Sequence, residues 1–353
     1  MKKPPENYEP SRILVIQLRQ IGDVLLTTPA LRALRKRFPA ARISFLADKV
    51  PARVLEENPN LDEIIRRGPE EGKLEPLRTI NKVRKGKYDL VIDFLANPRT
   101  TVLSVLSGAE VTMSFAGSRR SRFYTLAVEA EGIFSARQKL SLLRVLGCDT
   151  DDLELEMPVP EGAREKMENW LQSQTGLKRP LVCLEPFSKW PVLEYPNRYH
   201  RELARMMIEK WDATVVLCWG PGREEEARRM VQNTPASLWL APPTDLLEAA
   251  ALYQKADLWV GNDGGARHVA AGQGVPTFAV FGPTGHEWTP AGETHQSVAN
   301  DNIPCRPCNK RYCPEGHHDC MNGFQPEEVF NLLDRFFQSL QASQQETRGR
   351  AEN

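Results

Sequence analysis

Short apolar runs alternate along the chain with longer stretches whose apolar residues recur at helical spacing. The runs favour buried strands, and the spaced pattern favours helices that pack against them. In the first half we expect strands at 12–18, 42–47 and 88–94 and helices at 24–38, 49–58, 74–85 and 99–107. Pro29 falls inside the first helix, where it should interrupt the helix and restart it.

The same alternation resumes after a linker with two prolines at 157–160. Here we expect strands at 181–184, 213–218, 238–240, 256–260 and 275–281, and helices at 162–173, 199–211, 224–231, 245–254, 268–274 and 325–340. Alternating strands and helices are typical of parallel sheets covered on both faces. The predicted fold class is therefore α/β, with two Rossmann-like βαβ domains (1–160 and 161–335) that face a cleft. A polar, disordered tail is expected at 341–353.

Composition narrows the classes of function. The chain has 353 residues, of which 41% are hydrophobic and 26% charged, and its formal net charge is zero. These values are ordinary for a soluble globular protein, and the charge balance gives no reason to expect a nucleic-acid partner. No apolar run approaches the roughly 20 residues that span a bilayer. The basic start lacks the apolar segment of a signal peptide, so we expect the protein to stay in the cytoplasm. A monomer is the expected oligomeric state.

The loop at 261–268, of sequence GNDGGARH, concentrates polar groups between two apolar strands. Gly264 and Gly265 allow the backbone to approach a ligand closely, and the first N–H groups of the following helix suit an anion such as a diphosphate. A simple tight turn is the alternative interpretation. The gathering of Asp263, Arg267 and His268 at the same turn favours a ligand site.

This stretch resembles the D-[ST]-G-x-x-H-x-A-A-x-x-x-P-x-x-x-x-F-G-P-T signature of the lipopolysaccharide heptosyltransferases, which are ADP-heptose glycosyltransferases. It departs from the signature at Gly264, where family members carry Ser or Thr. The stretch at 14–31 resembles the amino-terminal signature of the same family, most closely the branch that adds the third heptose. The resemblance implies a GT-B architecture and inverting transfer of heptose from ADP-heptose to the lipopolysaccharide inner core.

Asp23 is the candidate catalytic residue. An isolated Asp at the start of a helix is more simply interpreted as an N-cap. The resemblance instead gives Asp23 the role of general base, and inverting transfer does need one carboxylate to accept the proton of the attacking hydroxyl.

The resemblance also implies the donor contacts. Asp263 matches the residue that contacts the sugar and His268 the one beside the diphosphate. The family's phosphate-binding lysine falls on Leu193, so Lys189 is the expected replacement. Glu224 matches the ribose contact, although Glu225 is equally reachable. The expected donor-binding residues are Ser188, Lys189, Glu224, Asp263, Gly264, Gly265 and His268.

An anionic acceptor should meet cations in the first domain. The expected acceptor-binding residues are Arg19, Arg99 and Arg120. The helix at 24–38 also carries a basic face made of Arg32, Arg35, Lys36 and Arg37. That face is either a solvated helix surface or a contact for a phosphorylated acceptor or an anionic membrane. With a lipid-anchored acceptor, peripheral association with the inner face of the inner membrane is expected.

Four cysteines, Cys305, Cys308, Cys313 and Cys320, form a late cluster. Four thiolates could close a tetrahedral structural zinc site, although this spacing is not that of a standard zinc motif. The transfer chemistry itself requires no cofactor, because helix-start N–H groups and cations can stabilise the leaving diphosphate.

Three other functions stay open. The chain could use another nucleotide-sugar donor, or it could be a nucleotide-sugar epimerase that needs no acceptor. The departures at Gly264 and Leu193 also leave room for a non-catalytic nucleotide-sugar-binding protein.

Overall fold

The computed structural model describes residues 8–68, 72 and 74–351. The chain divides into a first unit, Met1–Pro158, and a second unit, Val159–Asn353. No helix in the described ranges is both long enough and apolar enough to cross a membrane.

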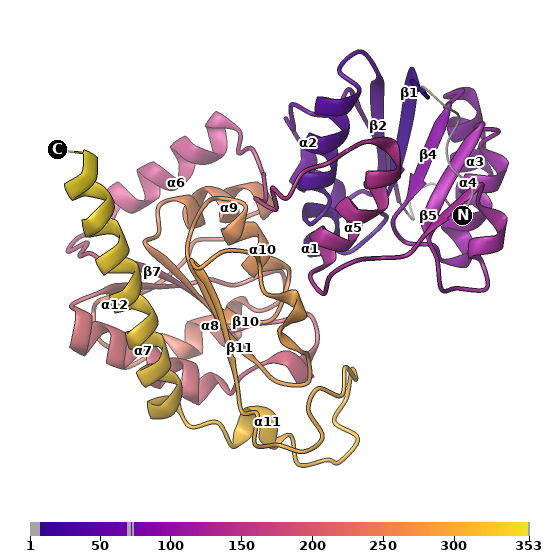
Figure 1. The fold of residues 1–353 in the computed structure, drawn as a ribbon. Coiled ribbons are helices and arrows are strands. Elements are labelled where there is room, and N and C mark those ends of the chain that lie inside the picture. The colour runs from indigo at the N-terminus through magenta and orange to yellow at the C-terminus, as the bar shows by residue number, and fades with distance from the viewer. Residues whose placement is uncertain (1–7, 69–71, 73, 352–353) are drawn as a thin grey trace. The chain divides into compact units, whose positions relative to one another are not determined.

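The first unit is built on a six-stranded parallel sheet (Figure 1). Its strands are β1 (Arg12–Ile16), β2 (Arg42–Asp48), β3 (Glu63–Arg67), β4 (Leu90–Asp93), β5 (Val111–Phe115) and β6 (Leu126–Val128). They lie in the order β3-β2-β1-β4-β5-β6. β3, β5 and β6 were not expected from the sequence. β3 and β6 are the edge strands of the sheet. The sequence of β3, EIIRR, contains three charged residues, which edge strands tolerate. These charges interrupt the apolar run by which a buried strand is recognised.

Helices cover both faces of this sheet. They are α1 (Ile21–Leu25), α2 (Thr28–Arg37), α3 (Glu75–Lys85), α4 (Pro98–Leu106) and α5 (Ser135–Leu143). α2 packs on α5, whereas α3 and α4 pack on each other, and Figure 1 shows the two groups on opposite sides of the strands. The expected interruption at Pro29 is confirmed, because a new helix begins there. The helix expected at 49–58 is only a 3₁₀ turn, Pro51–Leu55, and the left-handed φ of Glu57 ends any continuation.

The second unit repeats the same topology. Its strands are β7 (Leu181–Glu185), β8 (Thr214–Leu217), β9 (Leu238–Leu240), β10 (Leu258–Asn262), β11 (Thr277–Phe281) and β12 (His295–Ala299), in the order β12-β11-β10-β7-β8-β9. Counted from its own first strand, this is the strand order of the first unit. Both units are therefore doubly wound Rossmann-type sheets, and the α/β fold class is confirmed.

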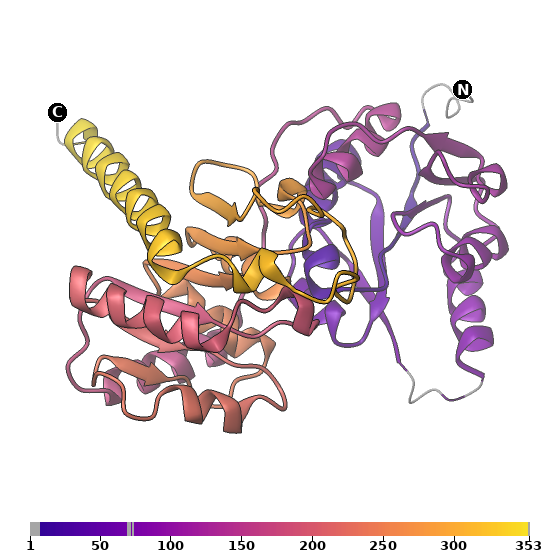
Figure 2. The same cartoon turned by 90° about the horizontal axis from the view of Figure 1, so that it is seen from below.

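The helices of the second unit are α6 (Glu161–Ser173), α7 (Asn197–Trp211), α8 (Glu224–Met230), α9 (Leu246–Gln254), α10 (Gly265–Ala271), α11 (Asp319–Asn322) and α12 (Pro326–Ala351). α7 packs against α8 and α12, and α9 packs against α6 and α10. The last helix, yellow in Figure 2, continues to Ala351. The expected helix end at Leu340 was therefore wrong, and the expected disordered tail is helical as far as Ala351.

The strand order fixes where a ligand can bind. In a doubly wound sheet, ligands bind in a crevice at the carboxyl ends of the two central strands. The strand order reverses at this point. These strands are β1 and β4 in the first unit and β7 and β10 in the second. The segments that follow these four strands, loops or first helical turns, carry Asp23, Arg99, Ser188 and Asp263.

Candidate active site

Asp23 lies in the first turn of α1, directly after β1. Its carboxylate Oδ2 accepts a hydrogen bond from the backbone N–H of Gln20 at 3.1 Å, as part of a capping box. The helix cap is Gln20, so Asp23 is not the N-cap that the simpler interpretation assumed. The capping bond fixes the direction of a half-buried carboxylate at the carboxyl edge of the sheet.

Lys139 on α5 also contacts this turn. Its Nζ donates to the backbone oxygen of Asp23 at 2.8 Å, and the side chain is only 3% exposed. Burial lowers the pKa of Lys139 to about 8, and the charge of Asp23 opposes that fall. A buried ammonium needs a partner, and here the partner is the residue expected to act as base.

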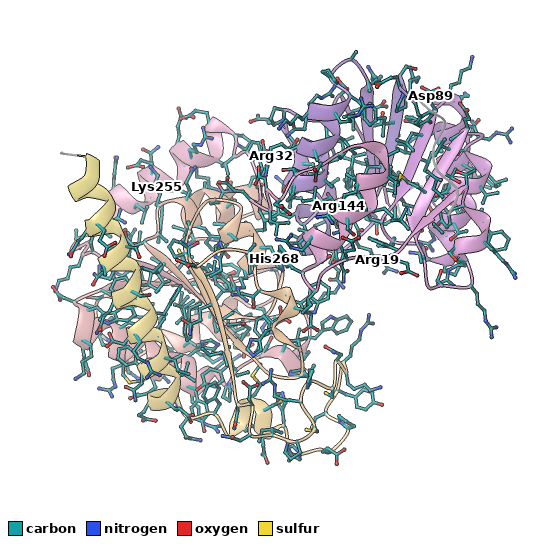
Figure 3. The ribbon with its side chains drawn as sticks, viewed as in Figure 1. Arg19, Arg32, Asp89, Arg144, Lys255 and His268 are labelled. Atoms are coloured by element: carbon teal, nitrogen blue, oxygen red, sulfur yellow. The ribbon has the colours of Figure 1, made fainter. Side chains whose placement is uncertain are left out.

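Two of the three expected acceptor arginines act on one carboxylate. Arg19, labelled in Figure 3, and Arg99 are both exposed, and their charges reach Asp48 at the end of β2. Burial raises the pKa of Asp48, while Arg67, Arg19 and Arg99 oppose the rise. Arg120 is tied to a different place, since its Nε donates to the Ala96 oxygen at 2.7 Å.

The basic face of α2 is largely occupied by ion pairs. Arg32 contacts Asp152 at 2.8 Å, Arg35 contacts Asp62 at 2.6 Å, and Arg37 contacts Glu9 at 2.7 Å. Their carboxylate partners come from the first unit itself. Of the two interpretations of this face, the structure favours a structural surface over an anion-binding one.

In the second unit the loops after β7 and β10 are joined. The Oγ of Ser188 donates to the Asp263 oxygen at 3.3 Å. Asn262 donates through its Nδ2 to the Pro186 oxygen at 2.8 Å and accepts from the Tyr195 N–H at 2.9 Å. The structure thus brings Ser188, Asp263 and Gly264 together, and it gives Asn262 a loop-tying role.

Asp263, Arg267 and His268 are all buried, with exposed fractions of 8%, 0% and 4%. Arg267 donates to the Thr277 hydroxyl at 3.1 Å and to the Gln296 oxygen at 3.0 Å, so it points under α10 into the sheet. Burial lowers the pKa of Arg267 to about 9 and raises that of Asp263, and each charge moderates the shift of the other. Arg267 therefore supports the loop from inside.

The loop after β7 is held by a second ion-pair network. Glu194 accepts the Ser188 N–H at 3.0 Å and pairs with Arg223 at 2.7 Å. Glu224 instead pairs along its own helix with Arg228, at 2.6 Å. Lys189 lies 5.5 Å from the Trp190 ring, and Arg311 lies 4.5 Å from the same ring. Arg311 thus places a second cation against Trp190, a contact that the sequence did not predict.

The glycines of the 261–268 loop differ in purpose. A Cβ on Gly261 would lie 2.6 Å from the Glu185 oxygen, so glycine is required there for β10 to pair with β7. A Cβ on Gly264 would meet only the Ser188 Oγ, at 3.7 Å, an ordinary contact. The protein itself therefore does not require glycine at 264. A cavity of about 680 Å³ along α7 and α12 includes none of these loop residues.

Comparison with known proteins decides the family. The profile of glycosyltransferase family 9 (heptosyltransferase) matches residues 77–318, more than half of the chain. The chain belongs to glycosyltransferase family 9. It is 27% identical over 289 residues to lipopolysaccharide heptosyltransferase 3 of Escherichia coli, covering 77% of this chain and 84% of that protein. It is 26% identical over 326 residues to lipopolysaccharide heptosyltransferase 1 of Pseudomonas aeruginosa, covering 86% and 87%.

Solved structures of the family show the same fold. The glycosyl transferase family 9 structure from Veillonella parvula has a TM-score of 0.78 at 24% identity, covering 93% of this chain and 97% of that one. E. coli heptosyltransferase WaaC with ADP-2-deoxy-2-fluoro heptose has a TM-score of 0.69 at 19% identity, covering 92% and 99%. The two doubly wound units are thus those of a GT-B glycosyltransferase, and the resemblance noted in the sequence is confirmed.

The described residues show no group of side chains arranged to hold the zinc ion that the cysteine cluster made possible. Within residues 8–68, 72 and 74–351, which include all four cysteines of the cluster, no three His, Cys, Asp or Glu side chains lie close enough to hold a metal ion. Cys320 belongs to the apolar core of the second unit, where burial raises its pKa to about 11 and the charges of Cys305, Cys308 and Cys313 add to the rise. One structural relative, TibC of enterotoxigenic E. coli, is an iron-containing dodecamer, with a TM-score of 0.58 at 13% identity, covering 95% of this chain and 80% of that one.

Proposed function

We propose that the chain transfers heptose, with inversion, from ADP-heptose to a sugar hydroxyl of the lipopolysaccharide inner core. The observation that carries this proposal is that each unit of this family 9 enzyme has an aspartate directly after a central strand of its sheet. Asp23 follows the first central strand of one sheet, and Asp263 follows a central strand of the other. Both loops stand where doubly wound sheets bind ligands.

Asp23 is the proposed general base. The acceptor O–H gives its proton to the Asp23 carboxylate while its oxygen forms a bond to the anomeric carbon. The bond from that carbon to the diphosphate breaks, and ADP leaves with the electron pair. The Gln20 N–H and the Lys139 ammonium support this step by fixing the turn that carries the carboxylate.

The donor is proposed to bind the second unit. Asp263 would accept hydrogen bonds from the sugar, and the backbone at Gly264 and Gly265 would face the diphosphate with His268 beside it. Ser188 and Lys189 would add contacts to the phosphates, and Glu224 would hold the ribose. The ion pair of Glu224 with Arg228 is 43% exposed on the glutamate side, so a ribose hydroxyl can compete for it at low cost.

The acceptor is proposed to bind Arg19, Arg99 and Arg120 on the first unit. We further propose a monomer in the cytoplasm that associates peripherally with the inner face of the inner membrane. The dodecameric relative gives the alternative assembly, and light scattering of the purified protein separates the two states.

A thermal-shift panel of nucleotides and nucleotide sugars, without added metal, tests the donor. A ligand at 100 times its Kd stabilises the folded state by about 2.7 kcal/mol. Selective stabilisation by ADP and ADP-heptose over UDP- and GDP-sugars is expected. Selective stabilisation by UDP- or GDP-sugars would instead mean the same fold with another donor, and product formation without acceptor would mean an epimerase.

A further inference from the structure

Exposed apolar side chains gather on the first unit. Ten large hydrophobic side chains are exposed in the part of the chain that the structure describes, and only two of them, Leu177 and Tyr312, lie in the second unit. The eight in the first unit are Val50, Leu74, Leu77, Val102, Val105, Leu106, Phe123 and Ile133. Scattered exposed hydrophobics are normal, but a concentration in one region indicates a contact surface.

Five of the eight lie on two neighbouring helices. Leu74 caps α3 and Leu77 lies in its first turn, 64% exposed. Val102, Val105 and Leu106 follow one another on the outer side of α4, at the three- and four-residue spacing of a single helix face. The opposite side of α4 is buried, so after Arg99 in the first turn the large side chains that this helix exposes are apolar.

Basic side chains accompany the apolar positions of α3. α3 and the residues just after it expose Arg78, Lys82, Arg84, Lys85 and Lys87. The single acid of α3, Glu75, is buried and pairs with Arg67 at 2.8 Å. The first unit as a whole carries 26 basic and 21 acidic residues, whereas the second carries 20 and 25, so a net charge of zero conceals +5 and −5.

This surface borders the acceptor side of the first unit. α3 and α4 pack together, as Figures 1 and 2 also show, on one face of the sheet. Each follows the carboxyl end of a strand, β3 and β4 respectively, so both begin at the sheet edge that carries Asp23. Leu77 and Arg99 stand in the first turns of the two helices.

We propose that the α3–α4 face, made of Leu74, Leu77, Lys82, Lys85, Val102, Val105 and Leu106, docks on an anionic phospholipid bilayer. Apolar side chains enter the headgroup region while lysines and arginines meet lipid phosphates, which is how interfacial helices bind. The mixture of both kinds of side chain over two convex helices fits a lipid surface better than a protein groove. The further role of presenting a lipid-linked sugar to Asp23 rests on the proposed function.

Vesicle flotation tests the surface directly. The full chain is mixed with vesicles of phosphatidylethanolamine and phosphatidylglycerol, or of phosphatidylcholine alone, at two salt concentrations. Binding to the anionic vesicles, weakened by salt, is expected. The double variant Leu77→Glu/Val102→Glu should bind them at least about tenfold more weakly, because each change places a charge where an apolar side chain would be buried.

Leu177→Glu is the matched control, since Leu177 is also an exposed leucine, 42% accessible, but lies in the second unit. It should float like the wild type. Lys82→Glu/Lys85→Glu tests the electrostatic part and should also lose binding. Absence of wild-type flotation, equal binding to phosphatidylcholine, or wild-type flotation of the Leu77→Glu/Val102→Glu variant would overturn the proposal.

A transferase assay separates this proposal from the proposed function. On a delipidated acceptor the Leu77→Glu/Val102→Glu variant should keep wild-type kcat/KM, and on a vesicle-embedded acceptor it should lose about tenfold. If the wild type transfers to neither acceptor, the proposed function fails while flotation still decides the surface. If the variant loses activity equally on both acceptors, the α3–α4 face belongs to the reaction itself and not to docking.

Discussion

The two units share one strand order but carry different side chains after their central strands. In each, six parallel strands wind outward from a central pair, and the loops that matter follow that pair. The crevice of the first unit carries a half-buried Asp23 and exposed arginines. That of the second unit carries Asp263, Arg267 and His268, all nearly inaccessible. Topology decides where a site lies, and the loops decide what it does.

Burial in the second unit follows from how its loop is built. Arg267 on α10 donates to the backbone of β12, and Asn262 bonds to the loop after β7, so the loop after β10 is fixed before a ligand arrives. The first unit fixes only the Asp23 turn and leaves its cations in water. A preorganised site suits a small donor, and an open one suits a large anionic acceptor. Four substitutions can break or sharpen this contrast.

The largest effect is expected from Asp23→Asn. Loss of the proposed proton acceptor should lower kcat by about 10²–10⁴-fold, with ADP-heptose affinity unchanged because the proposed donor-binding residues lie in the second unit. Steady-state kinetics and calorimetry measure the two quantities. Asp89→Asn is the control: this residue, labelled in Figure 3, bonds Ser11 and Arg12 before β4, and its loss should affect stability without affecting kcat. Near-normal turnover in Asp23→Asn would remove the base assignment.

Glu185→Gln tests the buried acid of the second unit. Burial raises the pKa of Glu185 to about 7, from an ordinary value near 4.5. The folded state therefore holds a proton that the unfolded state releases, so the stability due to this group is present below about pH 4.5 and lost as pH rises through 7. Relative to Glu185→Gln, the wild type should lose about 3 kcal/mol between pH 5 and pH 8.

Urea denaturation of both proteins at the two pH values measures this difference. Glutamine retains an oxygen that can accept the Tyr253 hydroxyl, now 3.0 Å away, so the fold should survive. Glu225→Gln, at an exposed position of α8, should show no such pH dependence relative to the wild type. Parallel stability curves for wild type and Glu185→Gln would mean that Glu185 is ionised in the folded protein.

Some of this was predictable from sequence and some was not. β7, β10 and β11 are uniformly buried five-residue strands, so an apolar run identifies them. α5 was missed, and with it Lys139, because lysine normally marks a solvated surface. The apolar neighbours of this lysine, Ala136, Leu140 and Leu143, are buried in α5, and their helical spacing in the sequence indicated a buried helix face. Its partner, Asp23, lies 116 residues away in the chain, so only the fold shows that the two residues are in contact.

Asp263→Asn should separate the sugar from the nucleotide. If Asp263 accepts hydrogen bonds from heptose, losing the charge should weaken ADP-heptose binding by about 10-fold or more and leave ADP binding unchanged. Calorimetry with both ligands gives the comparison. Equal weakening for ADP and ADP-heptose would show that the change disturbs the loop through Arg267, whose charge interacts with Asp263, and would withdraw the sugar contact.

The smallest expected effect, from Gly264→Ser, tests why this loop departs from the family signature. The φ of Gly264 is 169°, an extended conformation open to any residue, and a Cβ there meets only the Ser188 Oγ at 3.7 Å. The new hydroxyl should add one hydrogen bond to the donor phosphate and tighten ADP-heptose binding by about fivefold. Gly261→Ala is the contrast, since its Cβ would lie 2.6 Å from the Glu185 oxygen and should destabilise the second unit. Weaker donor binding in Gly264→Ser would mean that the ligand itself needs the bare backbone at 264, and the departure would then be a feature of specificity.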